Sequence, residues 1–484
     1  MLLIQNGLNC EYEMNVFIRL YFNNNDDGII YTNLSYEDNL IDAYCEIIYN
    51  GDTYFGEFKL EREKTTEKED KRFSSISVTR AFRIAAEKIF NVTLPWGVMC
   101  GVRPAKTVTK FLESGKTLKE THKILRDIYD VDEEKCILAE EVSKNETEIL
   151  SKIKENSVSV YIGIPFCPSR CLYCSFVSTD ISVSGKYMND FTDCLVREIE
   201  YTSELLRDTK KVVENIYIGG GTPTALDPVN LEKVLKAVKE NFDLTNINEY
   251  TVEAGRPDTI TKEKLEIIKK YGSNRISINP QTASDETLKR IGRRHTFEEF
   301  KNAYKMARDT GFSLINCDLI AGLPGENFED FKKSIDELLS LNPENITVHS
   351  MCIKRAAGLR HKIESLQEAD IMSKMLSYAQ NTLKSAGYSP YYMYRQKNIS
   401  GNLENVGYGK KGTFSFYNIN IMEEAQTIIA LGGGGSSKLV TKDGIGRIFN
   451  YKDPIEYIKN FNEILKRKDE TKKILRGDND AHWK

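Results

Sequence analysis

The chain has 484 residues, 40% hydrophobic and 29% charged, which is ordinary for a globular protein of two or three domains. Its 67 basic and 71 acidic residues give a net charge of −4, which argues against nucleic acid as the main partner. No apolar run approaches the length of a membrane helix, and the first residues lack the charged start of a signal peptide. We therefore expect a cytoplasmic protein with no membrane span, in which the cysteines are reduced.

Residues 1–155 are predicted to form an N-terminal α+β domain of unknown role. Apolar alternation and spacing predict the local structure of this range. The expected elements are strands at 15–22 and 52–60, a loop or helix start at 61–72, a helix at 79–90, a loop at 95–104, and two or three helices within 117–152, broken near Asp130.

From about residue 158, short apolar runs alternate with amphipathic helices. The predicted strands are 158–163, 215–218, 249–253, 275–278, 314–319 and 345–351. The predicted helices are 187–206, 230–241, 262–271, 296–311, 327–340 and 365–386. This alternation predicts right-handed βαβ units and a parallel sheet. Six units make three-quarters of an eight-unit barrel, so we expect an α/β fold with a partial (β/α)6 TIM-like barrel over 156–387.

Residues 388–484 are predicted to form a small C-terminal α+β region. An aromatic-rich strand is expected at 389–395, and a strand running into a glycine loop at 427–438. A six-unit barrel leaves a lateral gap, and this region is expected to cover it and the substrate. On that interpretation, deletion of 388–484 leaves intact the cysteine-containing loop after the first barrel strand.

Cys167, Cys171 and Cys174 have C-x3-C-x2-C spacing, and they follow the first predicted barrel strand. A cubane iron–sulfur cluster usually takes four thiolates, so three would leave one iron open to a ligand. A zinc site is less favoured because no fourth Cys or His lies nearby, and a disulfide would leave one thiol over. The motif therefore indicates a [4Fe–4S] cluster.

Unusual residues follow the other predicted strands. Gly219–Thr224 comes after the second strand, and Glu253 after the third. Asn279–Thr282 follows the fourth strand, and Asp318 the fifth, while Arg293–His295 lies one short helix after the fourth. Each alone is more often a cap or turn residue. Together they predict a ring of polar groups at the carboxyl ends of the strands, suited to an amine, a carboxylate and ribose hydroxyls.

With Tyr173 just before the third cysteine, the loop resembles that of radical S-adenosylmethionine (SAM) enzymes, whose open iron chelates SAM. The segments 161–174, 219–224, 275–281, 291–293 and 318–325, together with Glu253, resemble the oxygen-independent coproporphyrinogen III oxidase family, over about 158–440. The sequences of segments 101–106, 276–282 and 395–407 are similar to those of the HemZ-type branch, coproporphyrinogen dehydrogenase.

The resemblance implies a role for each matching position. Cys167, Cys171 and Cys174 would bind the cluster. Tyr161, Gly220 and Glu253 would contact the cluster-bound SAM, and a second SAM would be contacted by Tyr173, Gly221, Thr222, Gln281, Arg293 and Asp318. Cys352 stands where the family has a small residue. The chain departs from the family's best-known members at Gly163, where they have His, and at Phe176, where they have a fourth Cys.

The implied reaction is oxidative decarboxylation of two propionates of a tetrapyrrole to vinyl groups, with reduced flavodoxin or a ferredoxin-like protein as electron donor. Candidate partners for the substrate carboxylates are Lys354, Arg355, Arg395, Lys397 and Lys438, and the alternative for each is an ordinary surface charge. Tyr391, Tyr392 and Tyr394 would either face the tetrapyrrole or form the core of a small sheet. Two other functions stay open: a haem chaperone, although His482 is the one histidine after residue 363, and a radical methyltransferase acting on haem.

Overall fold

The computed structural model describes residues 1–22, 26–61, 66–91, 93–174, 176, 178–351, 366–396 and 402–477. The chain divides into two compact units. The first comprises Met1–Ser143, Glu364–Ser377 and Tyr394–Glu404, and the second comprises Lys144–Ile363, Tyr378–Met393 and Asn405–Lys484. These units do not follow the three ranges expected from the sequence, because segments of the C-terminal region belong to both. Within the described ranges, no helix combines the length and apolarity needed to cross a membrane.

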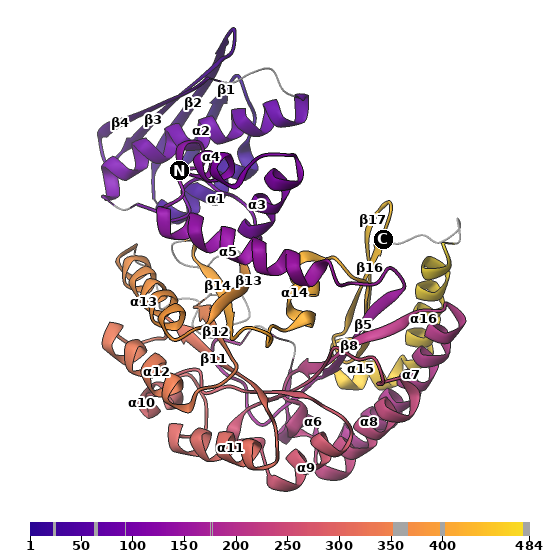
Figure 1. Ribbon diagram of the computed structural model, residues 1–484. Helices are drawn as coiled ribbons and strands as arrows, with labels where there is room; N and C mark the ends of the chain where they lie inside the picture. The colour runs from indigo at the N-terminus through magenta and orange to yellow at the C-terminus, as the bar shows by residue number, and fades with distance from the viewer. Residues whose placement is uncertain are drawn as a thin grey trace. The chain divides into compact units, whose positions relative to one another are not determined.

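The first unit is built on a four-stranded sheet in the order β1-β2-β3-β4, with helix α2 lying against it (Figure 1). A β-carbon at Gly56 of β4 would lie 2.0 Å from the Ala81 carbonyl oxygen of α2, so only glycine permits this close approach. The elements are β1 Leu2–Asn6, α1 Glu11–Tyr21, β2 Gly28–Glu37, β3 Leu40–Tyr49, β4 Asp52–Glu61, α2 Glu67–Phe90, α3 Pro104–Glu113, α4 Leu118–Asp127 and α5 Glu133–Leu150, whose last turns belong to the second unit.

Most local predictions for this unit are confirmed, with one exception. The strand expected at 15–22 is wrong, because these residues belong to helix α1. The buried side chains of this helix recur at helical spacing: Met14, Phe17, Ile18 and Tyr21. Burial of this apolar helix face favours the helix over the strand that the alternation of apolar residues within 15–22 suggested. The strand at 52–60, the helix at 79–90 and the helix break near Asp130, which has a φ of 59°, are all present.

The second unit is built on a sheet of eleven strands. Its order is β13-β14-β12-β11-β10-β9-β8-β5-β15-β16-β17. The six predicted strands occur in the expected order and pair in parallel, so the partial-barrel prediction is confirmed. They are β5 Ser157–Ile164, β8 Val212–Gly220, β9 Glu249–Gly255, β10 Arg275–Ile278, β11 Leu314–Ala321 and β12 Asn345–Ser350. No pairing between β13 and β17 closes the sheet among the described residues.

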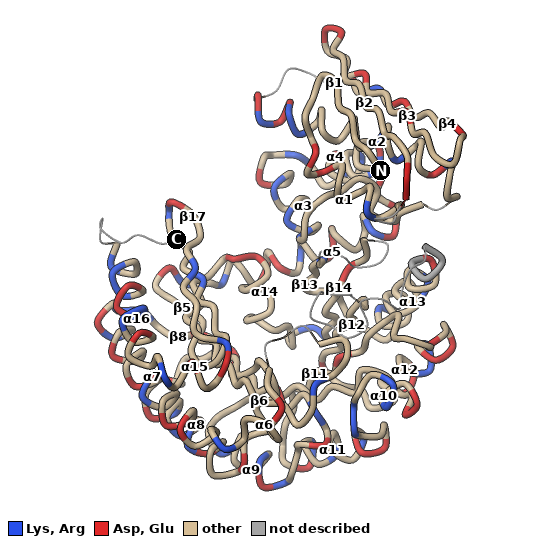
Figure 2. The backbone as a smooth tube through the Cα atoms, turned by 180° about the vertical axis from the view of Figure 1, so that it is seen from behind, with Lys and Arg blue, Asp and Glu red and all other residues tan. Residues whose placement is uncertain are grey.

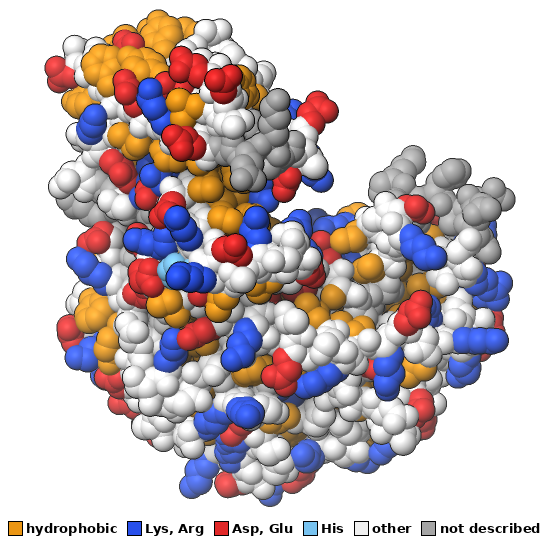
Figure 3. Space-filling model, turned by 45° about the horizontal axis from the view of Figure 1, so that its top comes forward, with side chains coloured by type: hydrophobic (Ala, Val, Ile, Leu, Met, Phe, Trp, Pro, Cys, Tyr) orange, Lys and Arg blue, Asp and Glu red, His pale blue; other side chains and the backbone are white. Residues whose placement is uncertain are grey.

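Helices lie along the outer side of this curved sheet (Figure 1). Charged residues concentrate on these helices, whereas each strand of the sheet carries at most two (Figure 2). On the face shown in Figure 3, basic and acidic side chains are interspersed. The helices are α6 Ile181–Ser184, η1 Gly185–Tyr187, α7 Met188–Asp208, η2 Pro223–Ala225, α8 Pro228–Asn241, η3 Pro257–Thr259, α9 Lys262–Lys270, α10 Asp285–Arg290, α11 Phe297–Asp309, α12 Phe328–Leu341 and α13 Leu366–Ser385.

The C-terminal region extends the barrel sheet at both ends. Strand β15 pairs in parallel with β5, and β14 pairs antiparallel with β12. The last helix, α16, lies against α7, where Lys468 forms a buried ion pair with Glu198 at 3.1 Å. The elements are β13 Ser389–Arg395, β14 Glu404–Gly409, α14 Phe416–Glu423, β15 Ile428–Gly432, β16 Ser436–Thr441, β17 Gly444–Phe449, α15 Pro454–Lys459 and α16 Phe461–Arg476.

Candidate functional site

The cysteine loop begins directly after β5, at the carboxyl edge of the sheet. Pro165 ends that strand, and Cys167 lies in the short strand β6 (Phe166–Cys167), which pairs with β7 (Thr179–Asp180). Cys167 and Cys171 are buried and Cys174 is half-buried. Burial raises the pKa of the Cys167 and Cys174 thiols. The loop is fastened to the barrel, because the Leu172 amide donates to the Ile291 carbonyl oxygen at 3.0 Å.

Arg256 is a site residue that the sequence analysis missed. Its Nη1 donates to Ser169 Oγ at 3.1 Å and to Cys171 Sγ at 3.5 Å, and its Nη2 pairs with Asp258 at 2.7 Å. A guanidinium beside a sulfur favours the thiolate, which is the form that binds iron. The available signal was its position three residues after Glu253, at the end of a barrel strand.

The glycines after β8 pack against the cysteine loop. The Gly221 amide donates to the Ile164 carbonyl oxygen at 2.7 Å, and the Thr222 amide donates to that of Phe166 at 2.8 Å. A β-carbon at Gly221 would lie 2.6 Å from the Phe166 oxygen. The Thr222 hydroxyl oxygen is 3.4 Å from Cys167 Sγ. These glycines therefore serve at least to bring the second strand's loop against the first, and Gly220 adopts a φ of 107° in doing so.

Glu253 lies next to this turn, half-buried in the barrel interior. A β-carbon at Gly219 would lie 2.7 Å from its Oε2. Burial raises the pKa of Glu253 to about 7, although hydrogen bonds from the Tyr217 hydroxyl and the Gly220 amide act in the lowering direction. A carboxyl group with this pKa changes charge near neutrality, so its affinity for a cation depends on pH.

Three tyrosine rings stack inside the barrel beside Glu253. Tyr161 of β5 lies parallel to Tyr217 of β8, with ring centres 6.3 Å apart. Tyr417 of α14 stacks on Tyr217 at 4.5 Å and 18°. The C-terminal region thus contributes an aromatic side chain to the barrel interior, which no local sequence signal indicated. The stack gives the interior a flat, apolar wall with hydroxyl groups at its edge.

Arg293 is buried and held by the loops around it. Its Nε and Nη2 donate to the Tyr173 hydroxyl at 3.2 and 3.0 Å, and its Nη1 donates to the Asn279 carbonyl oxygen at 2.8 Å. Gln281 adopts a φ of 71°, and its buried Oε1 finds no hydrogen-bond partner among the described residues. The structure therefore brings Tyr173 of the cysteine loop, Arg293 and Gln281 to the same edge of the sheet.

Asp318 lies in β11 and faces His349 of β12, a second residue that the sequence analysis missed. His349 Nε2 is 3.7 Å from Asp318 Oδ2, and Asn316 Nδ2 donates to Asp318 Oδ1 at 2.8 Å. Burial alone would raise the pKa of Asp318, but His349, Asn316 and Thr347 hold it below its usual value. Asp318 therefore stays ionised, as a partner for a cation must. His349 lies at the end of a predicted strand, where polar residues mark the site.

The donor set fits an iron–sulfur cluster better than a single metal ion. Among the described residues, no three Cys, His, Asp or Glu side chains converge to hold one ion. The cysteine loop offers three thiols, the ligands that iron–sulfur clusters take. The positions of Cys352, Lys354, Arg355 and Lys397 lie outside the described residues.

Two of the cations expected to bind the substrate carboxylates, Arg395 and Lys438, contact other groups of the protein. Arg395 is buried within the first unit, where its Nη2 donates to the carbonyl oxygens of Met99 and Gly101 at 2.8 and 2.7 Å. Burial lowers the pKa of Arg395 to about 10. Lys438 pairs with Glu424 at 3.5 Å. Arg395 is therefore neither a substrate ligand of the barrel nor a surface charge, because its guanidinium holds backbone carbonyl groups.

Two of the tyrosines of β13 that were candidates to face the tetrapyrrole are packed among other side chains. Tyr391 stacks on Phe414 with ring centres 4.8 Å apart, and both Tyr391 and Tyr392 are buried. A β-carbon at Gly407 of β14 would lie 1.8 Å from the ring of Tyr392, so the ring fills the space beside that glycine. Of the two interpretations, the buried core holds for these two residues, but the sheet is the eleven-stranded sheet of the barrel and not a separate small one.

Comparisons with known proteins place this arrangement in a family. Residues 161–338 match the radical SAM superfamily. The oxygen-independent coproporphyrinogen-III oxidase-like protein HemZ of Bacillus subtilis is 42% identical over 78% of this chain and 77% of its own length. The chain belongs to the radical SAM superfamily and to this oxidase-like family. Radical SAM proteins of this family use a [4Fe–4S] cluster and SAM, so a reductant and a substrate are also required.

Two further relatives show how broad the radical SAM oxidase-like family is. The heme chaperone HemW of Bacillus subtilis is 31% identical over 52% of this chain and 69% of its own length. The solved structure of coproporphyrinogen III oxidase HemN from Escherichia coli matches with a TM-score of 0.53 at 20% identity, over 69% of this chain and 79% of that chain. At that identity the structural match shows the fold. Family membership thus does not by itself distinguish an oxidase from a haem chaperone.

Proposed function

We propose that this chain is a radical SAM coproporphyrinogen dehydrogenase, which converts two propionate groups of coproporphyrinogen III to vinyl groups without oxygen and yields protoporphyrinogen IX. The observation that carries the proposal is the loop of three thiols, packed against the glycine turn beside Glu253, in a chain 42% identical to the HemZ protein. The 31% identity to a heme chaperone supports a second candidate, binding of unaltered haem.

Cys167, Cys171 and Cys174 would hold the cluster, with Arg256 beside Cys171. Together, a bound cluster and SAM supply a one-electron cleavage that starts radical chemistry. The protein's own contribution is to bind, orient and exclude water. Burial of Cys167 and Cys171 limits the access of solvent to these two sulfurs. The guanidinium of Arg256 offsets negative charge on the sulfurs, which would otherwise be costly in a buried site.

The SAM contacts are proposed from their position around the cysteine loop. Tyr161, Gly220 and Glu253 lie beside the loop and would contact the cluster-bound SAM, with an ionised Glu253 accepting hydrogen bonds from cationic or hydroxyl groups. Arg293, Gln281 and Asp318 lie at the same strand ends, together with Tyr173, Gly221 and Thr222, and would contact a second SAM. The Oε1 of Gln281, which has no partner among the described residues, is suited to accept a hydrogen bond from such a ligand.

The deciding experiment is anaerobic incubation of the reconstituted protein with SAM, a chemical reductant and coproporphyrinogen III, followed by mass spectrometry. We expect the loss of two carbon dioxide molecules per tetrapyrrole, with Cys171→Ala as the inactive control. A methylated tetrapyrrole would identify a methyltransferase instead. Absence of any product, with stoichiometric binding of unaltered haem in a separate titration, would establish the chaperone.

A further inference from the structure

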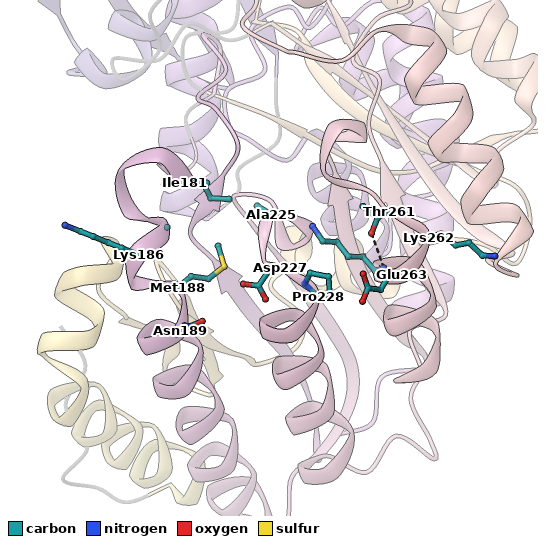
Figure 4. A pocket seen from close by; sticks show the side chains of 12 residues that line it. Ile181, Lys186, Met188, Asn189, Ala225, Asp227, Pro228, Thr261, Lys262 and Glu263 are labelled. Atoms are coloured by element: carbon teal, nitrogen blue, oxygen red, sulfur yellow. Dashed lines mark hydrogen bonds between the residues drawn. The ribbon is translucent and has the colours of Figure 1, made fainter.

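An open groove of about 900 Å³ lies at the rim of the barrel, outside the cysteine loop. It runs between α6 and the start of α7 on one side and the first turns of α8 and α9 on the other (Figure 4). Apolar side chains line it, among them Ile181, Met188, Ala225 and Pro228. The groove belongs entirely to the second unit. None of its lining residues is among those expected to contact the cluster or SAM.

The groove wall is joined to Cys167 by two short routes. Ile181 directly follows Asp180, which pairs with Cys167 between β7 and β6. On the other side, the Ala225 amide donates to the Thr222 carbonyl oxygen at 2.8 Å, and the Thr222 hydroxyl oxygen is 3.4 Å from Cys167 Sγ. The first route has one non-covalent contact, the strand pairing of Asp180 with Cys167, and the second route has two. A redox group seated in this groove would therefore lie next to the cysteine that comes first in the loop.

The surface around the groove combines exposed apolar side chains with cations. Val183 of α6 is 72% exposed and Val229 of α8 is 66% exposed, and each lies within two residues of a lining residue, Ile181 or Pro228. Lys186 and Lys262 point outward from opposite rims of the groove (Figure 4). The first turns of α8 and α9 also present the positive ends of two helix dipoles.

The lysines of the groove outnumber its acids among the described lining residues, although Lys262 also pairs with the exposed Glu266 at 3.7 Å. The carboxylate of Asp227 caps helix α8, accepting from the Asn230 amide at 2.9 Å. Glu263 is the other acid of the lining, beside three lysines, Lys186, Lys262 and Lys264. The Lys264 ammonium donates to the Thr224 carbonyl oxygen at 2.7 Å, so its charge lies at the base of the groove. An acidic partner with an apolar contact patch would match this surface.

We propose that this groove is the docking site of an acidic electron carrier of the flavodoxin type, which reduces the cluster held by Cys167. The inference rests on the proposed function, because it assumes that cluster. In each encounter the anionic flavin hydroquinone gives up one electron and becomes the neutral semiquinone, and the cluster gains that electron, with no proton transferred. The flat apolar edge of a flavin suits the apolar lining, and the acidic surface around it suits Lys186 and Lys262.

The test uses the full-length, cluster-reconstituted protein and a bacterial flavodoxin. The variant is Lys186→Glu combined with Lys262→Glu. The control is Lys332→Glu on α12, a lysine 41% exposed that pairs with Glu329 at 3.8 Å, much as Lys262 pairs with Glu266 at 3.7 Å. Two quantities are measured: the rate of cluster reduction by flavodoxin hydroquinone in anaerobic stopped flow, and the Kd of oxidised flavodoxin by calorimetry.

We expect the double variant to slow reduction by flavodoxin, and to raise its Kd, by roughly tenfold at low ionic strength, because complementary rim charges mainly steer association. Reduction by dithionite should be unchanged in all variants. Val229→Asp, which adds an acid to the first turn of α8 where a helix tolerates it, should weaken flavodoxin binding in the same way.

The outcomes separate the groove from the proposed function. Wild-type protein that cleaves no SAM even with dithionite would contradict the proposed function. Normal dithionite-driven cleavage, with flavodoxin reduction of the double variant within about twofold of wild type at low salt, would overturn the docking site. A carrier effect seen with a ferredoxin but not with flavodoxin would overturn the choice of partner.

Discussion

The Tyr217 hydroxyl donates a hydrogen bond to Glu253 from the neighbouring barrel strand. This bond is one of the contacts that hold the pKa of Glu253 near 7 despite its burial, which alone would raise it further. The pair couples the aromatic stack of the barrel interior to the one carboxyl group expected to contact the cluster-bound SAM. Its consequences can be measured through the pH dependence of SAM binding.

SAM affinity should increase as pH rises through about 7, where Glu253 becomes ionised. In Tyr217→Phe the lost hydrogen bond raises the pKa of Glu253, so the midpoint of the SAM-binding profile moves to higher pH. Calorimetric titration of the reconstituted protein with SAM, from roughly one pH unit below the pKa of Glu253 to two units above it, measures this shift. Glu253→Gln should remove this pH dependence, and a midpoint unchanged in Tyr217→Phe would contradict the assignment.

The same raised pKa has a consequence for stability. The folded-state pKa of Glu253 is about 7 and the ordinary value is about 4.3, so the folded protein binds the proton more tightly than the unfolded chain. Its contribution to stability is fully present below about pH 4 and is lost as pH rises to about 7. Glu253→Gln should therefore increase the free energy of unfolding at pH 8 relative to wild type, measured by urea denaturation, and by less at pH 5.

The buried ion pair between Lys468 and Glu198 predicts a large difference between two lysines on one helix. Lys468 and Glu198 are both almost completely buried, whereas Lys472, one turn later in α16, pairs with a half-exposed Asp208 at 2.6 Å. Lys468→Met leaves a buried carboxylate without its cation, which should cost about 3–5 kcal/mol. Lys472→Met should cost about 0–1 kcal/mol. Urea unfolding of both variants measures this, and equal costs would contradict it.

Arg256 should set how readily the cluster is reduced. Its guanidinium donates to Cys171 Sγ at 3.5 Å, and hydrogen bonds and positive charge at the sulfurs favour the reduced, more negative cluster. Arg256→Lys should keep the cluster but make its reduction potential more negative by about 60 mV, a tenfold change in the one-electron equilibrium. An anaerobic redox titration followed by electron paramagnetic resonance measures the potential. The exposed Arg294→Lys is the control, and a shift to positive potential in Arg256→Lys would refute this role.

The sequence was informative wherever local pattern and fold agree. Buried apolar runs separated by amphipathic helices predicted all six parallel strands of the barrel, and the C-x3-C-x2-C spacing located the loop after the first of them. It misled at 15–22, where a short alternation of apolar residues coincides with the helical face of Phe17 and Tyr21. Eight residues are too few to separate the two periods.

The remaining differences come from contacts between residues far apart in the chain. Strand β15 adds to β5 although about 270 residues separate them, and no local signal specifies such a pairing. The contact of Tyr417 with Tyr217 inside the barrel also joins residues far apart in the chain, as do the hydrogen bonds that Arg395 donates to backbone carbonyl groups of the first unit. No local signal specifies these contacts either. Arg256 and His349 could have been predicted as site residues from the sequence, because each lies at or just after the end of a predicted strand.

The C-terminal region leads to a prediction opposite to the one drawn from the sequence, in which deletion of 388–484 spared the cysteine loop. Ile428–Gly432 pairs along β5, and the Gly433 amide donates to the Gly163 carbonyl oxygen at 2.9 Å, four residues before Cys167. A chain ending at 387 would expose this side of β5 and leave Glu198 without Lys468.

We therefore expect the chain ending at 387 to lose cooperative unfolding and to retain little iron after reconstitution, because the strand that leads into the cysteine loop loses its neighbour and the unpaired edge favours aggregation. Iron and sulfide per chain, together with thermal unfolding by circular dichroism, measure both effects. The matched control ends at Gly477, at the end of α16, and should load iron normally. A folded chain ending at 387 with a full cluster would show that the region only covers the barrel and does not complete it.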